Sequence, residues 1–511
     1  MTTAVPRRGA VLGAVCLAAF AINIDTTIVN VALPSLSREL GAGTTDLQWI
    51  VAGYSLSFSA LVLAAGSLGD RYGRRPALLA GLLGFAAASG VGALCSTPGQ
   101  LIAVRFVMGL FAALIFPTTL SVITNTYADR KERAGAVGAW GAVGGLGVAV
   151  GPVAGGLLLT QFSWPSVFIA LVPVSIAAAV AVFLLVPESR DPAAPPLDLP
   201  GLLASSVAVG AMVYTIIEAP DRGWLSAASL VGFGVTLVVG VAFVRLERRT
   251  RHPMLDVSLF AERAFSAASG SVTIAFFSLF GFIFLITQYM QFVRGYGTLS
   301  TGVRILPVAL SLGAFAVLGA NFAARLGTRV IVGTGLVLLG GSFLWIAQDS
   351  ATVAYGLIVV QMVMMGSGIG LISTPATESI LSVLPPAKAG VGSAVNDATR
   401  ETGGTLGVAI IGSVYTSLYT SRLSTGSSHN LPPAALRAAK NSVGAGYAAS
   451  RQAPPNIRGA LLDHVQNAFM TGLHAGCYVA AGVCAVGVLG ALQLPASRPS
   501  DTTAPAPPAL G

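Results

Sequence analysis

Long apolar stretches alternate with short polar segments along almost the whole chain. Each stretch approaches or exceeds the roughly 20 residues that a helix needs to cross the hydrocarbon core of a bilayer. A closed β-barrel, the other structure that lipid accepts, would show short alternating segments, whereas the stretch at 77–95 is unbroken. The pattern therefore predicts an all-α, polytopic membrane protein.

A window of about 19 residues finds fourteen candidate transmembrane helices. They cover approximately residues 10–33, 48–69, 77–95, 100–127, 135–159, 165–186, 199–219, 224–246, 264–287, 300–322, 330–347, 353–375, 403–421 and 469–494. The first stretch follows Arg7 and Arg8, as in a signal peptide, but its length and Asp25 favour a retained helix. An even number of crossings places both termini on one side of the membrane.

Composition and charge agree with this interpretation. Of the 511 residues, 54% are apolar and only 10% are charged, too few charges to cover a water-facing surface. The net charge of +9 would suggest nucleic acid for a soluble protein, but most basic residues lie in short loops beside apolar stretches. Because 19 of the 29 basic residues fall on the side of the termini, we expect cytoplasmic termini in the cytoplasmic membrane and no nucleic-acid partner.

Two polar segments stand apart from the apolar stretches. The longest loop, 422–468, is predicted to lie outside, with possible surface helices near 434–440 and 456–466. The tail from Pro495 is rich in Pro, Ala and Ser, which predicts disorder. The four cysteines form no Cys-x-x-Cys pair and the four histidines are scattered, so we expect neither a metal nor another cofactor.

Asp25 lies near the middle of the first predicted helix, where an ionised carboxylate costs about 3 kcal/mol. One interpretation is a buried aspartate that only hydrogen-bonds Thr26, Asn30 or a neighbouring helix. The other is a proton carrier, because a carboxyl group in a low-dielectric cavity can bind and release a proton near neutral pH. We favour the proton carrier.

Arg105 is the one basic residue deep within a predicted span. Its guanidinium remains charged at physiological pH, so it needs a carboxylate, a carbonyl or a water-filled cavity. Asp25 and Asp70 are the candidate partners. The alternative is an arginine that reaches the membrane interface from near a helix end, but several apolar residues flank Arg105 on both sides.

Two further segments carry more glycine and charge than a membrane span or its orientation requires. The hairpin between the second and third helices contains Gly66, Asp70, Arg71, Gly73, Arg74 and Arg75. There, Gly73 permits a tight turn, and Asp70 is expected to cap a helix or to pair with an arginine across a closing interface. The fifth helix contains Gly141, Gly144, Gly145, Gly147, Gly151, Pro152, Gly155 and Gly156, a spacing that predicts close helix contacts and a kink at the proline.

The remaining polar and aromatic candidates are weaker. Glu218 and Glu378 lie near helix ends, and we expect both to be interfacial. The candidates for a substrate cavity are Asn30, Tyr54, Phe276 and Phe280. The aromatic residues of the ninth helix also fit a lipid-facing or core position.

Together these motifs resemble the major facilitator superfamily, specifically its fourteen-helix drug:proton antiporters of the QacA/EmrB type. Residues 66–75 fit the loop motif G-x-L-a-D-r-x-G-r-r, with Gly69 at the usual alanine, and residues 25–34 fit D-x-T-I-V-N-V-A-L-P. The motif L-x-x-x-R-x-x-q-G fits Leu101, Arg105 and Gly109, with Met108 in place of the glutamine. The antiporter motif g-x-x-x-G-P-x-x-G-G fits Gly147, Gly151, Pro152, Gly155 and Gly156.

The resemblance implies a major facilitator fold with two six-helix halves, at 1–190 and 264–494, an inserted helix pair and linker at 191–263, and a tail at 495–511. It also implies a monomeric, proton-coupled antiporter that exports small amphipathic or cationic organic compounds. The alternatives are a proton-coupled importer and a membrane sensor without transport. An enzyme is not expected, because the sequence lacks a phosphate loop, metal-ligand spacing and a nucleophile–base pair.

Overall fold

The computed structural model describes residues 8–191, 197–383, 389–424 and 433–494, which form sixteen α-helices and two short turns. The α-helices are α1 (Arg8–Glu39), α2 (Thr44–Tyr72), α3 (Arg74–Gly92), α4 (Pro98–Thr126), α5 (Arg130–Gln161), α6 (Pro165–Leu185), α7 (Leu199–Arg222), α8 (Ala227–Glu247), α9 (Arg263–Gln288), α10 (Thr298–Leu326), α11 (Thr328–Ile346), α12 (Tyr355–Ser382), α13 (Ala389–Ser424), α14 (Pro433–Asn441), α15 (Val443–Gln452) and α16 (Pro455–Ala491). A 3-10 turn at Val257–Ala261 precedes α9, and a π-helical turn at Tyr289–Val293 extends it.

Thirteen of the described helices are long and apolar enough to cross a membrane. The remaining long helix, α13, runs through the bundle beside α2, α9 and α16, although its first half is polar. It is therefore the fourteenth crossing, and the predicted number of helices is confirmed. The predicted start of this crossing at 403 is wrong, since the helix begins at Ala389.

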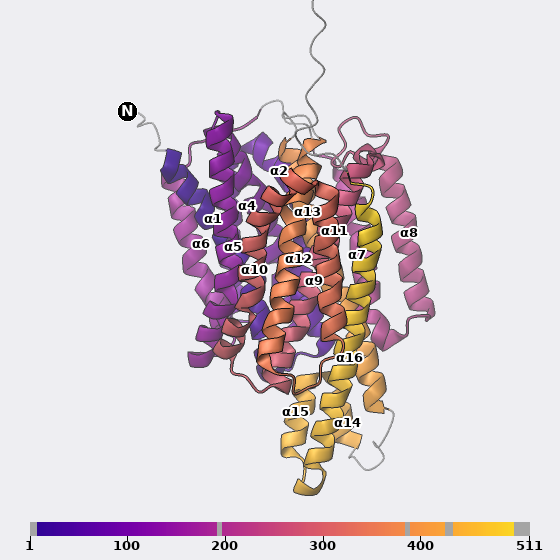
Figure 1. Cartoon of the computed structure of the whole chain (residues 1–511). Coiled ribbons are helices and arrows are strands. Elements are labelled where there is room, and N and C mark those ends of the chain that lie inside the picture. The colour runs from indigo at the N-terminus through magenta and orange to yellow at the C-terminus, as the bar shows by residue number, and fades with distance from the viewer. Residues whose placement is uncertain (1–7, 192–196, 384–388, 425–432, 495–511) are drawn as a thin grey trace, which may run out of the picture.

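The crossings form two six-helix halves with a helix pair inserted between them in the sequence. Helices α1–α6 pack against one another, and so do α9–α13 with α16. The inserted helices α7 and α8 pack on each other, and α7 contacts both halves, through α2 and α13. In Figure 1, α8 lies at the edge of the molecule, and α1 begins at the same end of the bundle at which α16 finishes. We call this the terminal end.

Helices α14 and α15 project from the opposite end, which we call the cap end (Figure 1). The predicted surface helix at 434–440 corresponds to α14, whereas residues 456–466 are not a separate helix. They form the first turns of α16, which continues from Pro455 to Ala491 without a break. The predicted disorder of the tail from 495 falls outside the described residues.

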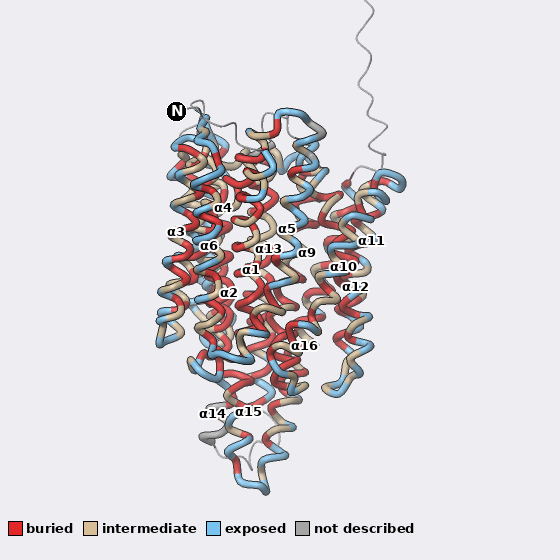
Figure 2. Tube along the Cα trace, turned by 90° about the vertical axis from the view of Figure 1, so that its left-hand side faces the viewer, coloured by how far each residue is buried: buried red, intermediate tan, exposed pale blue. Residues whose placement is uncertain are grey.

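The two halves meet through contacts near the cap end. The side-chain amide of Gln48 on α2 donates to the carbonyl oxygens of Val408 and Ala409 on α13, each at 3.3 Å. Gln291 donates to the carbonyl of Val31 at 3.0 Å. The residues at these contacts are also buried: the trace in Figure 2 is largely buried where the halves face each other. We call this contact between the halves the seam.

Equivalent glycine turns join α2 to α3 and α10 to α11. Gly73 has a φ of 121° and Gly327 a φ of 88°, backbone angles that residues other than glycine rarely adopt. Each glycine N–H also donates to the carbonyl four residues earlier, at 3.0 Å and 2.9 Å. The prediction of a tight turn at Gly73 is confirmed. The two halves thus repeat the same glycine turn, at Gly73 and at Gly327.

Candidate functional site

Asp25 of α1 and Arg105 of α4 form an ion pair inside the first half. One guanidinium nitrogen, Nη1, lies 2.8 Å from Oδ1 and 2.7 Å from Oδ2 of Asp25. The aspartate is 0% exposed and the arginine 2%. Each charge would be very costly at such depth without the other, so the pair explains how both residues are accommodated. Of the two predicted partners of Arg105, Asp25 is the one in contact.

Two groups of α2 hold the guanidinium in place. Its Nε donates to the carbonyl oxygen of Ile50 at 3.0 Å, and its carbon lies 4.3 Å from the ring centroid of Tyr54. The Tyr54 ring therefore faces the cation and stabilises it through its π electrons. One turn along α4, Gly109 packs on the Tyr54 backbone, where a Cβ would overlap Ser57. The motif that contains Arg105 and Gly109 thus clamps α4 against α2.

The glycine motif of α5 brings that helix against α1 on both sides of Asp25. A Cβ on Gly147 would lie 2.9 Å from Asn23 Cβ, and one on Gly155 would lie 2.7 Å from Ile28 Cγ1. Gly151, midway between them, faces Thr27 so closely that a Cβ has no room. These glycines recur every four residues, so they form one face of α5, and the predicted close helix contact is confirmed.

A neighbouring face of α5 contacts α10 of the second half. A Cβ on Gly156 would lie 2.7 Å from Leu299 Cα, and the Gly156 carbonyl accepts a hydrogen bond from Thr298 at 3.1 Å. Gly302 packs in the same way on the carbonyl of Pro152. Helix α5 therefore connects the segment that carries Asp25 to the seam between the halves.

We expect Gly151→Val to destabilise the folded protein. The added methyl groups would push α5 away from α1, and overpacking of this kind costs about 1–3 kcal/mol. In a protein of this size the melting temperature should fall by about 1–3 °C, measured on purified protein in detergent. Gly145→Val is the matched control on the same helix, because no atom lies within 4 Å of a Cβ there. Equal melting temperatures for the two variants would contradict the packing described here.

The hairpin between α2 and α3 is held by local contacts. Asp70 accepts a hydrogen bond from Arg74 Nε of its own hairpin at 2.8 Å. The expected helix cap is wrong, since α3 begins without a side-chain cap, whereas pairing across a closing interface stays a prediction. Arg75 Nη2 donates to the carbonyl of Phe183 at the end of α6, 2.5 Å away. The Asp70 carbonyl accepts the Asp191 N–H at 2.7 Å. The hairpin thus fastens α6 to the terminal ends of α2 and α3.

Helix α13 carries a charged cluster that was not predicted from the sequence, formed by Asp397, Arg400 and Glu401. Asp397 is 6% exposed, and the Arg400 guanidinium carbon lies 5.1 Å from the ring centroid of Phe276. Hydropathy placed these residues outside the span because they are charged. Their i, i+3, i+4 spacing, next to the predicted start of the span, was the available signal for a longer helix with one charged face.

Three of the weaker cavity candidates, Asn30, Tyr54 and Phe280, are buried, and the fourth, Phe276, is partly buried. Asn30 and Tyr54 are 2% and 1% exposed. Phe276 lies against Arg400, and Phe280 lies against Gly404 of α13. The aromatic side chains of α9 therefore pack at the α9–α13 contact. The core interpretation of these two rings is the one that the structure supports.

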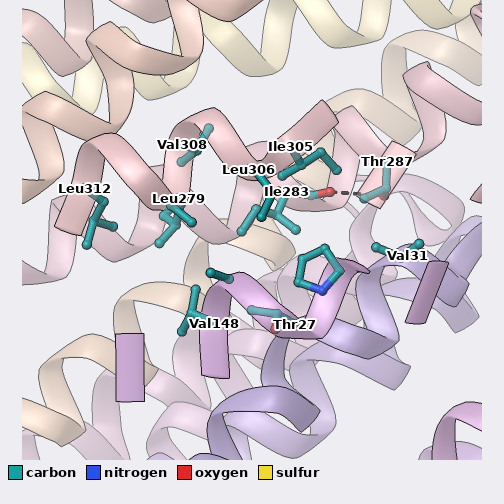
Figure 3. A pocket seen from close by; sticks show the side chains of 13 residues that line it. Thr27, Val31, Val148, Leu279, Ile283, Thr287, Ile305, Leu306, Val308 and Leu312 are labelled. Carbon is teal, nitrogen blue, oxygen red and sulfur yellow. Dashed lines mark hydrogen bonds between the residues drawn. The ribbon is translucent and has the colours of Figure 1, made fainter. Parts of the chain in front are cut away.

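A pocket opens between the halves. One of its lining residues, Thr27, lies two positions after Asp25 in the sequence. The thirteen lining residues come from α1, α5, α9 and α10. Figure 3 shows Thr27 and Val31 of α1 facing Ile283 and Ile305 across it. The wall is almost entirely apolar, and the Thr287 hydroxyl donates to the carbonyl of Ile283 at 3.1 Å. None of the four cavity candidates from the sequence lines this pocket.

The two glutamates expected at helix ends are both at least partly accessible. Glu218 accepts a hydrogen bond from the Trp49 indole N–H at 3.3 Å and pairs with Arg222 at 3.3 Å. Glu378 is exposed on α12. Neither residue contacts the Asp25–Arg105 pair in the described part of the chain.

Comparison with known proteins places these features in a family. The family model described as Major Facilitator Superfamily matches residues 15–408. Multidrug efflux pump LfrA of Mycolicibacterium smegmatis is 35% identical over 483 residues, which cover 94% of this chain and 95% of the relative. Puromycin resistance protein pur8 of Streptomyces alboniger is 34% identical over 439 residues, covering 84% and 86%.

Among solved structures, the fold resembles a bacterial homolog of the human lysosomal transporter Spinster, in an inward-facing and unoccupied conformation. The TM-score is 0.68 with 15% identity, and the match covers 96% of this chain and 98% of the other. At this identity the likeness concerns the fold alone.

Proposed function

Because the chain belongs to the Major Facilitator Superfamily, we propose that it exports small amphipathic or cationic organic compounds across the cytoplasmic membrane in exchange for protons. Relatives that are a multidrug efflux pump and a puromycin resistance protein support export of drugs. The observation that carries proton exchange is the buried Asp25–Arg105 pair beside the glycine face of α5.

The pair offers two states of the same site. With Asp25 ionised, its carboxylate holds Arg105 and fixes α1 against α4. A proton on Asp25 removes that attraction, so α1 gains freedom to shift relative to α4. Because α5 packs on α1 and also on α10, a shift of α1 reaches the seam between the halves. Protonation would in this way bias which end of the seam is closed.

The pocket between the halves suits the apolar part of a substrate. Leu279, Ile283 and Ile305 line it together with α5 and α1 (Figure 3). An apolar wall with few polar groups binds by burying surface, which tolerates many shapes. A cationic group on the substrate would be drawn toward the acidic residues of the protein interior.

For orientation, we assign the terminal end to the cytoplasm and the cap end to the outside. The excess of arginine and lysine on the side of the termini supports this assignment. The seam contacts near the cap end then correspond to a state that is closed toward the outside. The membrane potential supplies about 2.3 kcal/mol per charge per 100 mV to drive the cycle.

Cysteine labelling tests this topology. We expect Gln452→Cys, exposed on α15, to react with a membrane-impermeant maleimide in intact cells. Arg190→Cys, exposed at the terminal end, should react only after the cells are opened. Both changes belong in a Cys95→Ser background, since Cys95 is half-buried whereas the other three native cysteines are buried. Labelling of position 190 alone in intact cells would reverse the orientation.

Inside-out membrane vesicles distinguish export from the alternatives. With an acidic lumen, puromycin added to the medium should raise the lumenal pH, followed with a pH-sensitive dye, because each exported molecule is exchanged for protons. A proton-coupled importer would acidify the lumen further, and a sensor without transport would leave it unchanged. Vesicles without the protein are the control, and either of these last two results would overturn the proposal.

A further inference from the structure

A carboxylate of the second half, Glu401 on α13, interacts with the network around Arg105. It interacts electrostatically with Arg105 and with Tyr54, the residue whose ring covers the guanidinium. The Ser55 side chain, next to Tyr54 on α2, interacts with the Glu401 carboxylate. Helices α2 and α13 pack closely across the seam. The charge network of the first half thus extends into the second.

Two polar atoms in this network are buried without a hydrogen-bond partner. They are Oε2 of Glu401 on one side of the seam and the hydroxyl oxygen of Tyr54 on the other. Buried polar atoms in folded proteins are normally paired, so these two unpaired atoms call for an explanation. The vacancy identifies Glu401 as incompletely engaged in this conformation.

Arg400, the basic neighbour of Glu401, shares its charge among several groups. The Arg400 guanidinium lies over Phe276 and donates through Nη2 to the hydroxyl of Thr377 at 3.4 Å. Arg400 also interacts electrostatically with two carboxylates of the same helix, Asp397 and Glu401. Arg400 is therefore engaged with α9, α12 and Asp397 as well as with Glu401, whose carboxylate also interacts with Ser55 of α2.

We propose that Glu401 is a positioning residue for proton coupling: it balances the charge of Arg105 across the seam whenever a proton neutralises Asp25. In the structure described here, Asp25 is the direct partner of Arg105. When Asp25 accepts a proton, Arg105 keeps its positive charge, and Glu401 is the nearby carboxylate of the other half. The attraction then acts between α4 and α13, so protonation strengthens the contact between the halves. The inference rests on the proposed proton coupling and adds a second acidic residue to it.

The groups that face Glu401 set the sign of the expected effect. They are Tyr54 and Ser55 of α2, Arg105 of α4, and Asp397 and Arg400 of α13, with Asp25 acting through Arg105. Removing the Glu401 charge leaves Arg105 without a balancing carboxylate once Asp25 is neutral. Proton uptake then becomes less favourable and requires a more acidic medium.

Glu401→Gln tests the inference in the vesicle assay. We expect puromycin-driven proton movement to fall at least tenfold at neutral pH, and the pH of half-maximal activity to move about one unit toward acid. Puromycin binding, measured by quenching of tryptophan fluorescence, should change less than threefold. Glu378→Gln, an exposed glutamate on the neighbouring helix α12, is the matched control and should behave as the unchanged protein does.

A second variant separates coupling from a purely structural role. Tyr54→Phe keeps the ring over Arg105 and removes only the unpaired hydroxyl, so it should shift the pH profile in the same direction by a smaller amount. Loss of activity in Glu401→Gln without a shifted profile, or an unchanged profile with full activity, would overturn the role of Glu401. If the unchanged protein itself moves no protons with puromycin, the proposed function fails, and this inference fails with it.

Discussion

We expect Asp25→Asn to abolish uphill export driven by a pH gradient. The amide that replaces the carboxyl group keeps its size and an oxygen for Arg105, but it does not ionise, so it cannot exchange a proton. Dye efflux from energised cells should fall to the level of cells without the protein, and substrate should release no protons in vesicles. Downhill exchange of a neutral compound requires no proton and is expected to continue. Asp25→Glu should retain part of the activity.

Asp25→Asn also breaks a buried ion pair, which affects stability. Arg105 keeps the carbonyl of Ile50 and the ring of Tyr54, so the protein should fold, but with a lower melting temperature than the unchanged protein. Asp221→Asn, an exposed aspartate at the end of α7, is the control and should change neither property. Full gradient-driven efflux by Asp25→Asn would remove this residue from the mechanism and direct attention to Glu218 or Glu378.

Arg105→Lys should be almost as harmful to transport as Arg105→Ala. Lysine provides the charge, but it has no planar guanidinium that can donate to Asp25 and to the Ile50 carbonyl while it stacks on Tyr54. Transport should fall at least tenfold in both variants. Arg105→Ala should in addition lose about 3–5 kcal/mol of stability, because it leaves Asp25 buried without a partner.

Arg304→Lys is a close control for the arginine chemistry. Arg304 stacks on Tyr296 at 4.2 Å in the second half, away from the ion pair. If Arg304→Lys and Arg105→Lys impaired efflux equally, the loss would reflect a general need for arginines stacked on aromatic rings and not a special role of Arg105. Normal efflux by Arg105→Lys would show that charge alone suffices at this position. The double variant Asp25→Asn with Arg105→Ala should recover stability relative to Arg105→Ala, since no unpaired charge remains.

The sequence alone predicted the crossings and the tight turn between α2 and α3. Apolar length is imposed by the thickness of the bilayer, and lipid requires each crossing to satisfy its own backbone hydrogen bonds. These are local requirements, which leave a local pattern. The turn at Gly73 belongs to the same class, because its positive φ depends on one residue.

The structure differs from the sequence prediction where charged or polar segments find partners inside the protein. The polar start of α13 looked like a loop, yet residues 389–402 are helical because Arg400 and its acidic neighbours interact inside the bundle instead of facing lipid. Residues 456–466 looked like a surface helix, yet they extend α16 beyond the membrane-spanning part. Hydropathy reports how a segment interacts with lipid, and it does not report partners within the protein.

By itself, the sequence determined that an acidic and a basic residue must be buried in the first half, because Asp25 and Arg105 lie within apolar stretches where charge is costly. Only the tertiary structure decided that they bind each other, that Asp70 pairs with Arg74 of its own hairpin, and that Glu401 reaches the same network from the other half. The physical reason is that the cost of burying a charge depends on the residue and its depth, whereas its compensation depends on which helices pack side by side.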